Sequence, residues 1–121
     1  MKIAVSAQDS NLDAKIDPRF GRAQCFLVVD PDTWDFEIVD NKQNLQAPAG
    51  AGIQAAQIVS DSGADAVLTF NCGPKAFRTL EAAGVKVYVG VEGTVKEAVE
   101  AFKAGKIKPT DSANVDAHSG I

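Results

Sequence analysis

The chain has 121 residues, 45% of them hydrophobic and 23% charged, which is enough for one domain with its own hydrophobic core. The 12 basic and 16 acidic residues give a net charge of −4 without a basic cluster, which argues against nucleic-acid binding. The sequence contains no apolar run of the roughly 20 residues that a membrane-spanning helix needs, and its first apolar stretch is too short for a signal peptide. We therefore expect a cytoplasmic protein that does not bind membranes, with its 2 cysteines reduced and unpaired.

The first half of the chain predicts three strands. Residues 2–7 form a short β-rich run, and the polar segment that follows as far as residue 22 lacks periodicity, which predicts a long loop. An apolar run at 25–30 and an alternating run at 34–39 flank turn residues, so we expect a β-hairpin there. Residues 40–51 predict a second polar loop.

The second half predicts helices that alternate with strands. An apolar stripe of helical period begins at residue 53 and ends before Gly63, and a strand follows at 66–70. Pro74 suits the first position of a second helix, which Gly84 ends before a strand at 85–89. The third helix begins after a capping box formed by Thr94 and Glu97 and ends at Gly105.

The element order β-β-β-α-β-α-β-α predicts an α/β domain with a five-stranded mixed sheet and helices on both faces. If the first three strands form a meander, strand 2 is antiparallel, and a right-handed crossover places strand 4 beside strand 1, so the order is 3-2-1-4-5. We expect this domain to cover residues 1–106 and residues 107–121 to form a flexible tail.

The predicted topology brings the end of strand 1, the start of strand 2, the end of strand 4 and two helix starts to one rim of the sheet, where open α/β sheets bind ligands. Helix starts attract anions through unpaired N–H groups. Two glycine-rich helix starts, two arginines, and polar residues at the strand ends are the candidate binding residues. They are Ser6, Arg19, Arg22, Gly50, Gly52, Asn71, Cys72, Gly73 and Lys75.

Several of these residues leave alternatives open. Cys72 lies between a strand and a helix start, which favours the thiolate form and makes it the candidate metal ligand, although a small buried residue would also suit this position. Cys25 fits a core position in strand 2. Arg19 and Arg22 either clamp an anion or pin the loop, for example against Asp9, Asp13 or Asp17. The single histidine, His118, lies in the predicted tail.

The chain resembles the dinitrogenase iron–molybdenum cofactor biosynthesis family over roughly residues 1–106. The resemblance rests on the opening strand, on blocks around the two arginines and the two glycine-rich helix starts, and on the segment 83–88, in this order. They are Lys2-Ile3-Ala4-Val5-Ser6, Arg19-Phe20-Gly21-Arg22-Ala23, Gly50-Ala51-Gly52, Gln54-Ala55-Ala56-Gln57, Cys72-Gly73-Pro74-Lys75-Ala76-Phe77 and Ala83-Gly84-Val85-Lys86-Val87-Tyr88. It implies a ribonuclease-H-like fold and transient binding of an iron–sulfur or molybdenum-containing cluster, or its precursor, during cluster assembly.

The resulting hypothesis is a non-catalytic carrier of such a cluster, a monomer or weak homodimer that meets cluster-assembly proteins. The sequence offers no nucleophile–base pair and no carboxylate dyad near the rim, so we assign no catalytic residue. The alternative is a small anion- or nucleotide-binding regulatory module that uses the same helix starts without metal.

Overall fold

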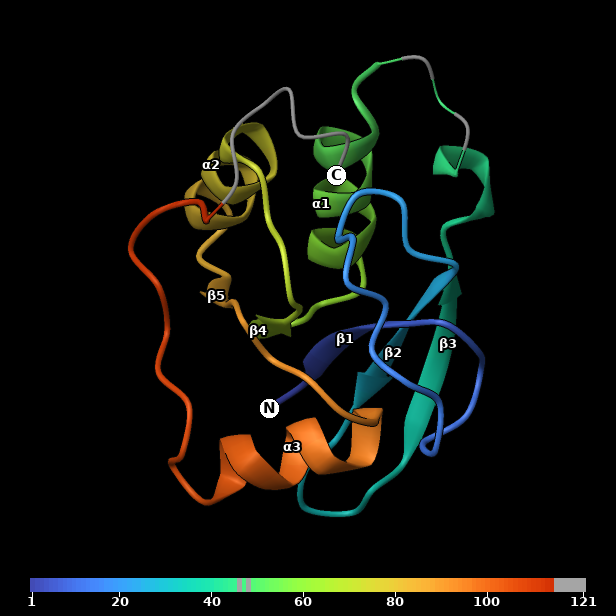
Figure 1. Cartoon of the computed structure of the whole chain (residues 1–121), viewed down its shortest axis with the longest axis vertical. Coiled ribbons are helices and arrows are strands. Elements are labelled where there is room, and N and C mark those ends of the chain that lie inside the picture. Colours follow the sequence, from blue (N-terminus) through green and yellow to red (C-terminus); the bar gives the residue numbers. More distant parts are fainter. Residues whose placement is uncertain (46, 48, 115–121) are drawn as a thin grey trace.

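The computed structural model describes residues 1–45, 47 and 49–114, and Figure 1 shows their arrangement. Apolar runs form the buried strands, while stripes of helical period form the helices that cover them. The strands are β1 (Ile3–Ala7), β2 (Cys25–Val29), β3 (Phe36–Asp40), β4 (Ala66–Leu68) and β5 (Lys86–Tyr88). The helices are α1 (Ala51–Asp61), α2 (Pro74–Ala82) and α3 (Val95–Lys103), with a short 3₁₀ turn, η1, at Lys42–Asn44.

The five strands form one mixed sheet in the order β3-β2-β1-β4-β5, which confirms the predicted order. Strand β2 runs antiparallel to β1 and to β3, whereas β4 is parallel to β1 and to β5. The carboxyl ends of β1, β4 and β5 therefore lie at the same edge of the sheet. This arrangement places the loops that follow these three strands beside one another.

Helices cover both faces of the sheet. Along β1 the side chains alternate: Ala4 packs with α1 and α2, while Ile3 and Val5 pack with α3 on the other face. All residues of β1 and β2 are buried because both of their faces are covered. Edge strand β3 is more open, and its Ile38 remains 52% exposed.

The helix ends follow the local sequence signals. The capping box at α3 is confirmed, because the Thr94 side chain accepts from the N–H of Glu97 while the Glu97 carboxylate accepts from the N–H of Thr94. Gly63 and Gly84 follow α1 and α2 with φ of 81° and 78°. Strand β3 begins at Phe36, two residues later than the predicted 34, because Trp34 has a left-handed φ of 67° in the turn. In the described part of the chain, we find no helix with the length and apolar character that crossing a membrane requires.

Two segments predicted to be featureless make specific contacts with the sheet. Within the predicted loop 8–22, Ile16 forms an antiparallel bridge with Ala7 and is buried. Part of the predicted tail is also attached, because the N–H of Thr110 donates to the Val87 carbonyl (2.7 Å) and Asn114 bonds to the segment that precedes α2. The remaining tail residues, 115–121, lie outside the described residues. Long-range hydrogen bonds hold both segments to the sheet. Such bonds leave no periodic pattern in the sequence, so the sequence alone does not indicate them.

Candidate functional site

The candidate site lies where the loop after β1 meets the loop after β4. The N–H of Asn71 donates to the Pro18 carbonyl (2.9 Å), and the N–H of Phe20 donates to the Asn71 carbonyl (3.2 Å). These two bonds form a short parallel bridge between Arg19 and Asn71. We call residues 15–20, 69–73 and 91–94 the rim. The structure thus brings together segments more than 50 residues apart in sequence, as the topology predicted.

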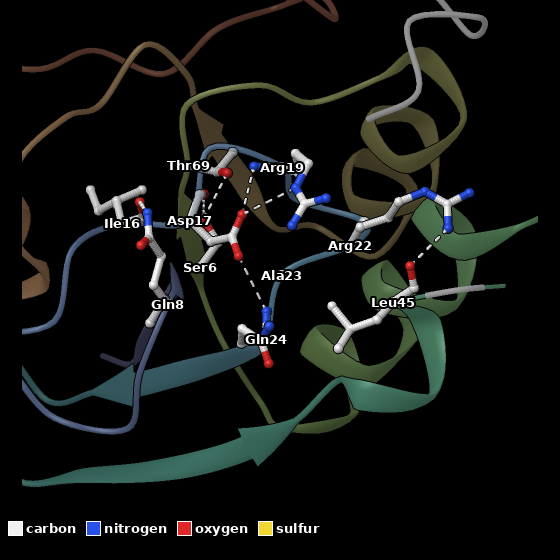
Figure 2. A network of polar contacts seen from close by, with 12 residues as sticks. Ser6, Gln8, Ile16, Asp17, Arg19, Arg22, Ala23, Gln24, Leu45 and Thr69 are labelled. Atoms are coloured by element: carbon white, nitrogen blue, oxygen red, sulfur yellow. Dashed lines mark hydrogen bonds and ion pairs between the residues drawn. The ribbon is translucent and has the colours of Figure 1, made fainter.

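A buried polar network holds the rim in place (Figure 2). The Ser6 hydroxyl donates to the Asp17 carbonyl (2.7 Å), so the Thr69 hydroxyl, 2.8 Å away, must donate to the Ser6 oxygen. The Asp17 carboxylate accepts from the N–H groups of Arg19 (3.1 Å) and Gln24 (3.3 Å). Because Ser6 is fully buried and its hydroxyl is used internally, its predicted role in ligand binding is replaced by a structural one.

The two arginines have different roles. Arg22 points toward the loop before α1, and its Nη1 donates to the carbonyls of Asn44, Leu45 and Ala47 at 3.0 to 3.4 Å. It therefore pins a loop, which is the second of the two roles that the sequence left open, although the loop is the one before α1 and its acceptors are carbonyls. Arg19 is paired only through Nε with Asp17 (3.6 Å), and its side chain is 46% exposed. Its terminal nitrogens remain the better candidate for contact with a ligand.

The start of α1 is packed tightly. A Cβ built on Gly52 would lie 3.2 Å from the Cβ of Ala76 in α2, and one on Gly21 would lie only 2.9 Å from the Cα of Gly52. The glycines therefore allow α1, α2 and the loop at Gly21 to approach one another. Gly50 precedes the helix with a left-handed φ of 76°. Gly52 is partly exposed and serves helix packing, whereas Gly50 is exposed.

The start of α2 is the more open of the two. Gly73 occupies the N-cap and has no side chain with which to cap the helix, and the first turn contains no acidic residue. Lys75 lies in this turn and is exposed, while Asn71 and Gly73 are partly exposed. Uncapped N–H groups with a cation nearby suit an anion. By contrast, α3 at the same rim is closed by its own Glu97 carboxylate.

Neither cysteine presents its sulfur to solvent. Cys72 is fully buried in the core beneath α1 and α2, and burial raises the pKa of its thiol to about 12. The structure therefore corrects the prediction of a thiolate at Cys72. Loss of hydration raises the pKa of the thiol more than the partial positive charge of the helix start lowers it. Cys25 packs in the other core, where burial and the nearby Asp9 carboxylate raise its pKa. Both thiols are free, as predicted.

The described residues also offer no ready-made metal centre. No group of three or more His, Cys, Asp or Glu side chains within them is arranged to hold a metal ion. His118 lies outside the described residues.

A cavity of about 320 Å³ opens at the rim, on the side next to α3. Three loops line it, those after β1, β4 and β5, and the lining is mixed, with apolar side chains and both signs of charge. Its lining residues are Gln8, Lys15, Ile16, Pro18, Phe70, Val91, Glu92 and Gly93. Sequence reasoning missed all of them, and four of them (Gln8, Lys15, Ile16 and Pro18) lie in segment 8–22, which lacks periodicity over its length. A weak signal is the alternation in Ala14-Lys15-Ile16, where only Lys15 is exposed.

Comparison with known proteins identifies the family. The model of the dinitrogenase iron-molybdenum cofactor family matches residues 1–105, which confirms the resemblance found in the sequence. An uncharacterised protein from Methanocaldococcus jannaschii is 28% identical over 113 residues, covering 89% of this chain and 90% of that protein.

Two solved structures share both fold and sequence with this chain. The apo form of the orange protein from Desulfovibrio gigas is 46% identical, with a TM-score of 0.92, and the match covers 94% of this chain and 96% of that one. A NifB-like protein from Thermotoga is 32% identical with a TM-score of 0.78, covering 94% and 98%. The architecture described above is therefore that of its relatives.

Proposed function

This chain belongs to the dinitrogenase iron-molybdenum cofactor family, and on that premise we propose that it is a non-catalytic carrier of an anionic iron–sulfur or molybdenum-containing cluster, or of its precursor. The similar protein from Desulfovibrio gigas adds support, because it is called the orange protein and its structure is described as an apo form. Cluster-assembly proteins are the partners that this role implies.

One observation carries the proposal: Arg19, whose side chain is 46% exposed, is bridged through its backbone to Asn71, two residues before the N-cap Gly73 of the uncapped helix α2. The bridge to Asn71 sets the backbone of Arg19, and the Asp17 carboxylate holds its Nε. An anion that binds here is attracted by the positive charge of Arg19, whose planar guanidinium can donate two parallel hydrogen bonds. Lys75 in the first turn of α2 and Lys15 at the cavity add positive charge.

The burial of both thiols sets the mode of binding. A cluster held by protein thiolates needs accessible, deprotonated cysteines. Here Cys72 and Cys25 are buried and both pKa values are raised. We infer that the cluster binds as an intact anion that keeps its own sulfide ligands, held by hydrogen bonds and charge. Such binding is reversible, as a carrier requires.

The second candidate, a metal-free anion- or nucleotide-binding module, uses the same groups at α2. The uncapped first turn without acidic residues favours any anion of suitable size. The two functions differ in their ligands. Thermal stabilisation by phosphate compounds, with none by a sulfide-rich molybdenum anion, would favour the regulatory module.

The test is anaerobic reconstitution with molybdate or iron in the presence of sulfide, followed by desalting. Metal content and visible absorption report binding. Arg19→Ala should weaken binding about tenfold to a hundredfold, the size expected when a charge-assisted hydrogen bond is lost. Arg78→Ala removes the same charge from an exposed position of α2 and is the matched control.

A third variant, Cys72→Ala, tests the role of the buried thiol. If the thiol is not a ligand, the affinity for the cluster should stay within about twofold of that of the original chain. Loss of the visible spectrum in this variant would show that the sulfur is a ligand. Equal effects of the two arginine variants would mean that only general charge matters and would remove Arg19 from the site.

A further inference from the structure

We propose that Asn114 latches the segment 107–114 onto the residues before α2 and that this latch competes with the ligand. The inference rests on the proposed function, because it concerns the same rim. It makes the segment after α3 a regulatory element of the site.

Asn114 makes four hydrogen bonds to three consecutive rim residues. Its Oδ1 accepts from the N–H of Cys72 (2.7 Å), and its own N–H donates to the Cys72 carbonyl (3.2 Å). Its Nδ2 donates to the Phe70 carbonyl (2.9 Å) and to Oδ1 of Asn71 (3.3 Å). Through its side chain and its backbone N–H, Asn114 thus pairs with one donor and three acceptors of the segment that leads into α2.

The rest of the segment brings Asn114 to this position. In Figure 1 it leaves the end of α3, passes β5 and reaches the region of α2. The N–H of Thr110 donates to the Val87 carbonyl (2.7 Å), the Thr110 hydroxyl donates to the Ser112 carbonyl (2.8 Å), and Ala113 packs against the core beneath α1 and α2. The segment therefore crosses the open edge of the sheet and ends over the rim.

The carboxamide of Asn114 and a bound anion would compete for the N–H of Cys72. An anion at the start of a helix takes N–H donors of the first turn and of the residues before it. The carboxamide oxygen of Asn114 already occupies the donor at Cys72, and an approaching anion would meet this partly negative oxygen. Asn114 itself is exposed, so water can replace its bonds and the latch can open at small cost.

The latch can be measured without ligand by amide hydrogen exchange of the full chain. Asn114→Ala should speed exchange of the Cys72 N–H relative to the original chain, since its acceptor is lost. Asp111→Ala, at an exposed position of the same segment, should leave that rate unchanged. An unchanged Cys72 rate in Asn114→Ala would overturn the latch whether or not the protein binds clusters.

Competition is tested with tetrathiomolybdate, a sulfide-rich molybdenum anion. Asn114→Ala should bind it on the order of tenfold more tightly, because the ligand no longer displaces the latch, and Asp111→Ala should gain much less. In the original chain, ligand should move the Asn114 side-chain amide resonance to that of a solvent-exposed amide.

The outcomes separate the two proposals. Weaker or equal binding by Asn114→Ala, or an Asn114 resonance that stays unchanged when ligand is bound, would refute competition while leaving the carrier function intact. If no variant binds any metal–sulfide anion, the carrier function fails and the competition fails with it, whereas the exchange data still decide whether the latch exists.

Discussion

Burial of Cys72 makes a quantitative prediction about its reactivity. The ordinary thiol pKa of 9.0 is raised to about 12 by loss of hydration. A raised thiol pKa favours the neutral form, so at a pH of about 8 the fraction of thiolate is about a thousandfold lower than for a free cysteine. Because the side chain is also fully buried, a reagent must wait for local opening.

The assay is alkylation by iodoacetamide, followed by mass spectrometry in a Cys25→Ala background. Cys72 should react at least about a thousandfold more slowly in the native chain than in urea. The complementary variant, Cys72→Ala, leaves only Cys25, which should also be protected because its pKa is raised.

The reasoning would be refuted by a native rate within about tenfold of the unfolded one. Cys72 would then be accessible and ionisable, and direct ligation of the cluster by its sulfur would have to replace the purely electrostatic mode proposed above.

Three further predictions concern packing, capping and salt. Gly21→Ala should lower the free energy of unfolding by about 1–3 kcal/mol in urea titrations, because its Cβ would lie 2.9 Å from the backbone of Gly52. The control is Gly73→Ala, which has open space around it and should lower the free energy of unfolding by less than about 1 kcal/mol. Equal losses of stability in the two variants would contradict the clash at Gly21. Thr94→Ala should cost about 0.5–2 kcal/mol at neutral pH, because the Thr94 hydroxyl no longer accepts from the N–H of Glu97, and a cost near zero would contradict the cap. The backbone N–H of Thr94 and, second, its hydroxyl lower the pKa of the Glu97 carboxyl below its ordinary 4.5, so the stability that this carboxylate contributes is present above 4.5 and lost as pH falls through the lowered value. Because the backbone N–H remains in Thr94→Ala, the difference between the two chains should shrink only partly in acid, and its complete loss would contradict a cap made by the hydroxyl. Cluster affinity should fall as ionic strength rises, and a salt-independent affinity would argue against recognition by charge.

The helices and strands could be predicted from the sequence because the signals for them lie in residues close together in the chain. The apolar run of β2, the capping box of α3 and the glycines after α1 and α2 depend on residues a few positions apart. Chain order and the right-handed crossover then fixed the sheet order. The start of β3 was misplaced because the backbone of Trp34 follows the turn and not the alternation of side chains.

The candidate site was predicted in outline only. The meeting of the ends of β1 and β4 could be expected from topology. The sequence left two roles open for Arg22 and two for Cys72 and could not choose between them, and it did not reveal that the Ser6 hydroxyl bonds internally. Whether a polar group meets a ligand or a neighbouring carbonyl depends on long-range hydrogen bonds, such as those from Arg22 to the loop before α1. The pKa of Cys72 depends on burial, which the residues on either side of it do not reveal.

The sequence by itself determined the family, the alternation of strands and helices, and which strand ends lie together, because these follow from short-range patterns and chain order. Only the tertiary structure decided that both sulfurs are buried, that Arg19 keeps an exposed guanidinium, and that Asn114 bonds to the residues before α2. Each of these depends on burial or on hydrogen bonds between distant segments, which form only when the chain has folded.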